Sequence, residues 1–201
     1  MSVHSLRAGG RGDARLARVA LAIALAFALA GVAVLGKGLY IHAKAALAQV
    51  LIHVAWAERL AGTAAQPKPW PWADTHPVAR LTMPRLGVDQ IVLAGATGRT
   101  LAFGPAAVQG LGLAATTVLS GHRDTHFAFL RDLVPGDDLA LQGADGVTQR
   151  YSVASGAIVH EGDVRLAESD APTLVLATCW PFDAIDPGTP WRYLVTAVAK
   201  R

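Results

Sequence analysis

The stretch TLVLATCWP, residues 173–181, holds the only cysteine of the chain, Cys179. Residues 173–178 are mostly apolar or β-branched, which predicts a buried strand, and the Trp-Pro pair after Cys179 predicts its end. The thiol therefore lies where a rigid strand opens into a loop with room for a ligand. An inert buried cysteine is the alternative, because a lone cysteine becomes a catalytic candidate only beside a base from elsewhere in the chain.

Short apolar or alternating runs continue on the N-terminal and C-terminal sides of this stretch, between residues 77 and 199. Turn-forming segments separate them, such as AGATG (94–98), PGD (135–137) and ADG (144–146). The pattern predicts an all-β barrel or sandwich of seven or eight short strands, with one short helix at residues 125–133. The predicted strands are residues 78–83, 88–93, 116–120, 138–142, 148–154, 173–178 and 193–199.

Two further polar side chains stand at the ends of predicted strands. His122 follows the β-branched run TTVLSG (116–121), and Arg192 follows the turn PGTPW (187–191) at the start of the last strand. Together with Cys179 they supply the parts of an acyl-transfer site. A thiolate attacks a carbonyl, an imidazole moves protons near neutral pH, and a guanidinium stabilises developing negative charge.

These motifs resemble those of the sortases, the cysteine transpeptidases of bacterial surfaces. The resemblance rests on LSGHR (119–123), on LVLATC (174–179) and on Arg192, in matching order and separation, and covers roughly residues 77–199. More narrowly, SGHRDTHF (120–127) and CWPFD (179–183) resemble the dedicated sortases of Gram-negative proteobacteria, class GN. The segment GPAA (104–107) departs from the pattern, because it lacks the Gly-His expected after Gly-Pro.

The resemblance implies an eight-stranded sortase-type β-barrel with short helices, and a two-step reaction without metal or other cofactor. Cys179 would attack the peptide bond after Thr in an LPXTG-like sorting signal of a dedicated substrate protein and form a thioester. His122 would protonate the leaving amine and then deprotonate the acceptor, so that an amine gives transpeptidation and water gives hydrolysis. Arg192 would hold the substrate and stabilise the oxyanion, and Thr178 would assist.

The neighbours of His122 have less specific roles. Asp124 and His126 are expected to orient the loop or the catalytic histidine, or to contact substrate. The His-x-x-x-His spacing of His122 and His126 is also that of a helical zinc site, but no Glu follows the first histidine and Ser120-Gly121 disfavours a helix there. Because thiolate and imidazolium must coexist, the activity is expected to have a bell-shaped pH profile.

The N-terminal part of the chain predicts a membrane anchor. The chain is 52% hydrophobic and only 16% charged, and residues 19–36 carry no charge, a run that spans roughly 27 Å as a helix. The basic residues before it predict a cytoplasmic N-terminus, which puts the catalytic domain on the outer face, in the periplasm of a bacterium with a single-pass inner-membrane anchor. A cleaved signal peptide, with the small residues ALA (28–30) at the cut, is the alternative.

Four segments and a catalytic domain follow from these observations. Residues 37–62 predict an amphipathic juxtamembrane helix, and residues 63–76 a linker rich in Pro and Trp, whose Trp70 and Trp72 would pack on the domain or lie at the membrane interface. The predicted divisions are a cytoplasmic segment at 1–18, the transmembrane helix at 19–36, the juxtamembrane helix at 37–62, the linker at 63–76 and the catalytic domain at 77–201.

Two other classes of protein stay open on the sequence. In a membrane-anchored β-barrel that only binds or scaffolds, Cys179 would be buried and His122 would cap a loop. In a thiol hydrolase of the same fold, water would be the only acceptor. The net charge of +3 is small and lies largely in the N-terminal arginines, so nucleic acid is not an expected partner.

Overall fold

The computed structural model describes residues 10–109, 116–164, 171–186 and 188–200. The chain divides into two compact units, one ending at Leu47 and the other beginning at Ala48. The helices are α1 (Gly10–Leu60), η1 (Pro84–Leu86), α2 (Gly98–Leu101), η2 (Ala128–Asp132) and η3 (Glu161–Asp163), where η marks a 3-10 helix. The strands are β1 (Pro77–Met83), β2 (Val88–Ala94), β3 (Ala106–Gln109), β4 (Thr116–Ser120), β5 (Asp138–Gly143), β6 (Thr148–His160), β7 (Thr173–Cys179) and β8 (Trp191–Ala199).

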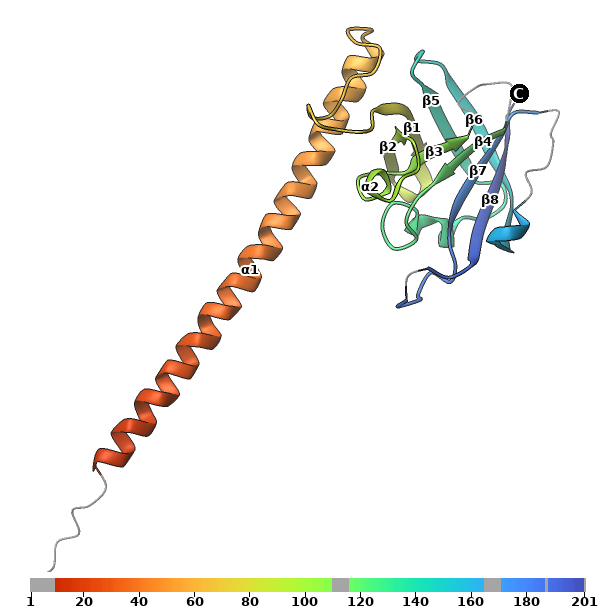
Figure 1. Ribbon diagram of the computed structural model, residues 1–201. Helices are drawn as coiled ribbons and strands as arrows, with labels where there is room; N and C mark the ends of the chain where they lie inside the picture. Colours follow the sequence, from red (N-terminus) through yellow and green to blue (C-terminus); the bar gives the residue numbers. More distant parts are fainter. Residues whose placement is uncertain (1–9, 110–115, 165–170, 187, 201) are drawn as a thin grey trace, which may run out of the picture. The chain divides into compact units, whose positions relative to one another are not determined.

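The eight strands close into a barrel in the order β1-β2-β3-β4-β7-β8-β6-β5 (Figure 1). Two neighbouring pairs are parallel, β2 with β3 and β4 with β7, and the other pairs are antiparallel. A closed barrel leaves no free sheet edge. The eight-stranded barrel expected from the sequence is confirmed.

The core fills the barrel with side chains that alternate along the strands. In β1 every second residue is buried, the period of a strand with one face toward a core. Strand β7 is buried along most of its length, which explains why its sequence reads as a continuous apolar run. The most deeply buried side chains of the barrel include Leu81, Met83, Leu119, Leu139, Tyr151, Leu174, Leu176 and Val195.

The first unit contains most of the long helix α1. Its apolar side chains are exposed along residues 19–35, and α1 is long and apolar enough to cross a membrane, the one such helix in the described ranges. One N-terminal apolar helix near the start of a chain is a candidate span, since signal sequences share these properties.

The last turns of α1 belong to the second unit and pack on the barrel wall. Ile52 and Trp56 are buried against Ile91 and Leu93 of β2. Gln49 donates a hydrogen bond from Nε2 to the Phe103 carbonyl at 2.7 Å. The compact unit therefore starts at Ala48, well before residue 77, because apolar contacts of the helix end continue the core outward.

The segment between α1 and β1 also packs on the barrel. The Trp70 ring meets the Phe103 ring edge to face, with 4.9 Å between centroids. Trp72, by contrast, is exposed. Of the two positions left open for these tryptophans, packing on the domain holds for Trp70.

Several element boundaries differ from the predicted ones; strand β8, for example, begins at Trp191 rather than at residue 193. Strand β3 is absent from the predicted set, because four residues of sequence AAVQ carry little strand pattern. Strand β6 runs to His160 rather than to residue 154, through a register shift between Val153 and Ser155 that lets it continue past Gly156. The helix predicted at 125–133 is the 3-10 helix η2, whose three residues per turn match the three-residue spacing of apolar side chains.

Candidate active site

Three strand ends meet at one end of the barrel, and each carries one of the predicted catalytic side chains. Strand β7 pairs in parallel with β4, with Ala177 opposite Ser120, and in antiparallel with β8, with Cys179 opposite Arg192. The Gly121 N–H donates to the Ala177 carbonyl at 3.2 Å, which extends the β4–β7 pairing by one step. His122 follows two residues after the last paired residue of β4, at the same end of the barrel as Cys179.

Cys179 is the last residue of β7 and is half-buried. Because residues directly opposite in an antiparallel pair point to the same face of the sheet, the side chains of Cys179 and Arg192 share one face. The thiol thus stands at a strand end beside a cationic residue, as the sequence predicts, and it is not the fully buried thiol of the inert alternative.

His122 is exposed, but the main chain before it is tightly held. The buried Thr178 hydroxyl donates to the Gly121 carbonyl at 2.7 Å, which ties the end of β7 to the His122 loop. A Cβ on Gly121 would lie 2.7 Å from Cγ of the buried Phe127 ring, so only glycine fits there. The Thr178 hydroxyl thus links the two strand ends, and its expected assistance at the substrate stays a prediction.

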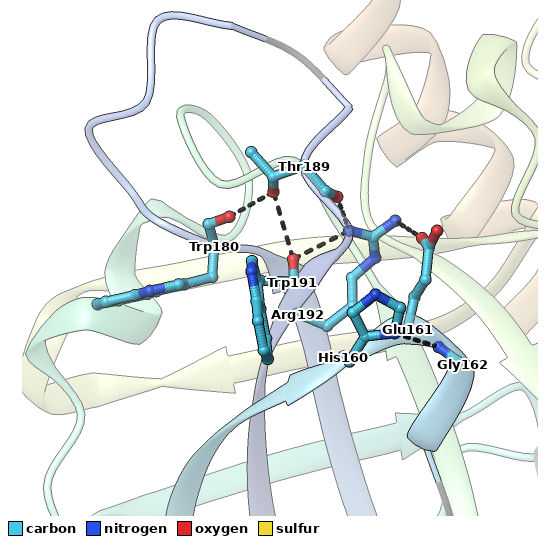
Figure 2. Close-up of polar contacts among 7 residues, drawn as sticks. All are labelled: His160, Glu161, Gly162, Trp180, Thr189, Trp191 and Arg192. Atoms are coloured by element: carbon cyan, nitrogen blue, oxygen red, sulfur yellow. Dashed lines mark hydrogen bonds and ion pairs between the residues drawn. The ribbon is translucent and has the colours of Figure 1, made fainter.

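Arg192 lies in a polar network (Figure 2). Its Nη2 pairs with Glu161 Oε2 at 2.5 Å, and its Nη1 donates to the carbonyls of Thr189 at 2.5 Å and Trp191 at 2.9 Å. The side chains of Arg192 and Glu161 are 27% and 54% exposed. A guanidinium with five N–H donors that is held by one partly exposed carboxylate and two carbonyls retains capacity for a ligand.

Glu161 is a residue of this site that the sequence analysis missed. It opens η3, directly after the end of β6, and its N–H donates to the Pro190 carbonyl at 2.8 Å. His160 caps the same turn, because its Nδ1 accepts from the Gly162 N–H at 3.3 Å, while its ring meets Trp191 edge to face (Figure 2). No sequence signal links Glu161 to Arg192, because only the register of β6 with β8 makes them neighbours.

Aromatic rings line the β7–β8 side of the site. Trp180, Phe182 and Tyr193 form mutual contacts with 5.5 to 5.8 Å between ring centroids. The Arg131 guanidinium lies 5.0 Å from the Phe182 ring centroid, in cation–π geometry. These contacts stiffen the start of the loop that follows Cys179.

Asp124 and His126 lie in the turns after His122. Residues 123–127 form turns rather than a helix, so His122 and His126 do not share the helix face that a His-x-x-x-His zinc site needs. Asp124 is exposed and His126 is half-buried. Burial lowers the pKa of His126, and the nearby His122 adds to this, while a hydrogen bond with the main chain of Ala102 and the Asp124 carboxylate act in the opposite direction.

A cavity of about 370 Å³ lies away from these residues. It is lined by residues at the beginning of β1, β4 and β6 and the end of β5, which form the opposite end of the barrel from His122 and Cys179. Its lining includes Arg59, Val78, Thr117, Gly143, Gln149 and Tyr151. The cavity is therefore separate from the thiol site.

A family model described as Sortase domain matches residues 81–200, more than half of the chain. The chain belongs to the sortase family. The matched residues include Cys179, His122 and Arg192, so the resemblance in the sequence is confirmed at the level of the family.

The individual sortases that match this chain cover only part of it. Sortase D of Bacillus subtilis (strain 168) is 35% identical over 80 residues, which cover 39% of this chain and 39% of that protein. Sortase A from Corynebacterium diphtheriae superposes with a TM-score of 0.58 at 23% identity, covering 65% of this chain and 63% of that one. Sortase C-1 from Actinomyces oris gives a TM-score of 0.54 at 28% identity, covering 62% of this chain and 73% of that one.

The matches thus cover under half of the curated relative and under two thirds of the Corynebacterium chain. At 23% identity the Corynebacterium structure shows the barrel fold alone. What the family and these neighbours establish here is a sortase domain on a sortase-type barrel.

Proposed function

We propose that this chain is a membrane-anchored sortase that cleaves an LPXTG-like sorting signal and transfers the new acyl end to an amine acceptor or to water. Cys179 is the nucleophile, His122 moves the protons and Arg192 stabilises the oxyanion. The single observation that carries the proposal is the strand register, because the β4–β7 and β7–β8 pairings bring these three residues to one end of the barrel.

The reaction has two steps. The Cys179 thiolate attacks the carbonyl carbon of the scissile peptide bond, the carbonyl oxygen takes up negative charge, and the Arg192 guanidinium stabilises that charge. When the C–N bond breaks, His122 donates its proton to the leaving amine, and a thioester stays on Cys179. His122 then takes a proton from the incoming amine or water, whose attack on the thioester breaks the C–S bond and releases the Cys179 thiolate, so that the starting thiolate and imidazolium are restored.

The alternative of a barrel that only binds a partner is less well supported. The Cys179 side chain is half-buried rather than sealed in the core, and it shares a sheet face with Arg192. A purely structural role would require neither feature. The family match supports the same preference.

The setting of the enzyme is part of the proposal. The uncharged run of α1, residues 19–36, anchors the protein, and the basic residues before residue 19 keep the N-terminus in the cytoplasm, so that the barrel lies in the periplasm of a bacterial inner membrane. The motifs SGHRDTHF and CWPFD support a class GN sortase with one dedicated substrate protein.

Intact-protein mass spectrometry tests the chemistry. The full-length protein in detergent is incubated with a panel of LPXTG-like peptides, as wild type and as Cys179→Ala and His122→Ala variants. We expect wild type to gain the mass of the peptide without its fragment after Thr, and Cys179→Ala to gain nothing. An amine acceptor should then yield a ligated peptide, which separates a transpeptidase from a hydrolase. Cleavage that survives in Cys179→Ala would refute the proposal, and so would the absence of adduct and cleavage across the panel.

A further inference from the structure

Arg123 is a buried arginine that joins two loops of the candidate site. It follows His122 directly in the chain, and only 9% of it is exposed. Its Nη2 donates to the carbonyl of Ala184 at 2.8 Å and to the carbonyl of Asp186 at 2.9 Å. Both acceptors lie in the loop between Cys179 and Arg192, which we call the β7–β8 loop (residues 180–190).

The base of the β7–β8 loop is held by its own contacts. The Trp180 N–H donates to the Trp191 carbonyl at 3.0 Å, and the Thr189 hydroxyl donates to the Trp180 carbonyl. The rings of Trp180 and Phe182 pack on Tyr193. These contacts end at Phe182 on one side and at Thr189 on the other.

The tip of the loop, residues 183–186, has fewer contacts: Ala184 is half-buried, and its N–H donates to the Pro181 carbonyl at 3.4 Å. Ile185 is 98% exposed, and Asp183 and Asp186 are exposed as well. Burial of a large apolar side chain therefore does not fix the tip. Among the described residues, Arg123 is the side chain that hydrogen-bonds to it, and it does so on either side of Ile185.

The other end of Arg123 is the main chain of the His122 loop. That loop is closed by a hydrogen bond from the Phe127 N–H to the His122 carbonyl at 2.9 Å and is tied to β7 through Thr178. A shift of the β7–β8 loop therefore displaces Arg123, the residue that follows His122 in the chain. The guanidinium can transmit such a shift because it is buried and its side chain cannot change rotamer into solvent.

Arg123 also has an unsatisfied donor. Its Nη1 is buried and has no hydrogen-bond partner within the described part of the chain. A buried N–H without an acceptor destabilises a fold, and a residue chosen for stability alone would avoid it. Local costs of this kind are expected at functional positions.

We propose that Arg123 is a positioning residue that couples the tip of the β7–β8 loop to His122. Resting on the proposed function, this inference means that Arg123 keeps the imidazole in place for proton transfer while the loop bounds the substrate site. Without it, the tip loosens, His122 loses its orientation, and the proton-transfer steps slow.

The test uses the full-length protein in detergent as wild type, Arg123→Met and Arg123→Lys. Arg80→Met is the matched control, because Arg80 also makes two short hydrogen bonds, to Asp89 at 2.7 and 2.5 Å, but does so between β1 and β2. Amide hydrogen exchange is followed in proteolytic fragments of the protein that cover residues 181–186 and 121–127. The kcat and KM for an LPXTG-like peptide are measured in parallel.

We expect Arg123→Met to speed exchange in both peptides and to lower kcat by about 10- to 100-fold with KM changed less than about threefold, the range for losing hydrogen bonds from a charged donor. Arg123→Lys keeps one ammonium that reaches fewer carbonyls, so it should recover part of both effects. Arg80→Met should change neither. If Arg123→Met does not fold, the same exchange and kinetic measurements on Arg123→Lys and Arg123→Gln test the inference.

Two results would overturn the inference. One is unchanged exchange in residues 121–127 when the loop peptide exchanges faster, since the two loops would then be uncoupled. The other is a loss of kcat equal to that of the Arg80→Met control. Exchange needs no substrate, so a wild type that cleaves no peptide would refute the proposed function while the coupling is still decided by the exchange data.

Discussion

The two sides of the candidate site are held in different ways. On the His122 side, the main chain is fixed by buried contacts: Gly121 against the Phe127 ring, the Thr178 hydroxyl on the Gly121 carbonyl, and the guanidinium of Arg123. On the Arg192 side, the guanidinium is held by a half-exposed carboxylate and two carbonyls.

This difference matches the roles proposed above for His122 and Arg192. A proton-transfer group has to be fixed within a fraction of an ångström, and buried packing provides that. A group that binds a transient charge has to exchange partners, and a partly hydrated ion pair allows it because such pairs contribute little to stability. The predictions below test this contrast, beginning with the largest expected effect.

Replacing Arg192 should separate activity from stability most clearly. We expect Arg192→Ala to lower kcat/KM by about 10²–10³, the usual effect of removing one oxyanion donor. Its melting temperature should stay within a few degrees of wild type, because its contacts are partly exposed. Peptide-cleavage kinetics and thermal melts measure the two quantities. A melting temperature that collapses with the activity would mean that Arg192 is a structural residue like those on the His122 side.

Adding one methyl group at Gly121 should damage the other side. In Gly121→Ala the new Cβ would lie 2.7 Å from the Phe127 ring, which is buried and cannot move aside easily. We expect kcat to fall by about tenfold or more and the melting temperature to fall by several degrees. Gly98→Ala is the matched control, because nothing lies within 4 Å of its added Cβ. Equal behaviour of the two variants would show that the His122 loop is not tightly packed.

The pair of Arg85 with Asp137 shows how a fixed arginine–carboxylate pair looks in this fold. Arg85 meets both Asp137 oxygens at 2.6 Å, and the Asp137 side chain is only 6% exposed. The Arg85 guanidinium lowers the pKa of Asp137, assisted by the Val134 N–H. A carboxyl whose pKa is lowered by folding stabilises the protein above its unfolded pKa of about 3.9, and this is lost as the pH falls toward the folded value.

We therefore expect Asp137→Asn to melt several degrees below wild type from pH 7 to about pH 5. The gap should close progressively below about pH 4, where wild type loses the charged pair too. Thermal melts of both proteins across this range measure it. A gap that stays constant down to pH 2.5 would mean that the Asp137 charge contributes nothing.

The smallest effect is expected at Glu161. Glu161→Gln removes one contact of Arg192 but leaves its two carbonyl partners in place. We expect kcat/KM to rise or fall by no more than about threefold at any salt concentration. The melting temperature should stay near that of wild type. A loss of stability as large as that of Asp137→Asn would erase the contrast between the two arginine pairs.

Much of the barrel could be predicted from alternation along the chain. Strands β1, β2, β4, β5 and β7 begin and end within about a residue of the predicted ranges, because each carries a period-2 or continuous apolar pattern bounded by turns. Strand β3 was not predicted because it is only four residues long. The end of β6 was predicted too early because Ser155-Gly156 is typical of a strand end.

For the site, the sequence by itself determined the reactive residue types and their position at strand ends: Cys179, His122 and Arg192. It also determined the apolar N-terminal helix. Local pattern encodes where a strand ends, and that is all these inferences required.

Only the tertiary structure decided which strand ends meet and what holds them. The parallel pairing of β4 with β7, the link from Thr178 to Gly121, the Glu161 partner of Arg192 and the reach of Arg123 to the β7–β8 loop all join residues tens of positions apart. Such contacts depend on strand order and register around the closed barrel. Neither strand order nor register can be predicted from the periodicity of a single segment, because a strand has the same pattern whichever neighbour it pairs with.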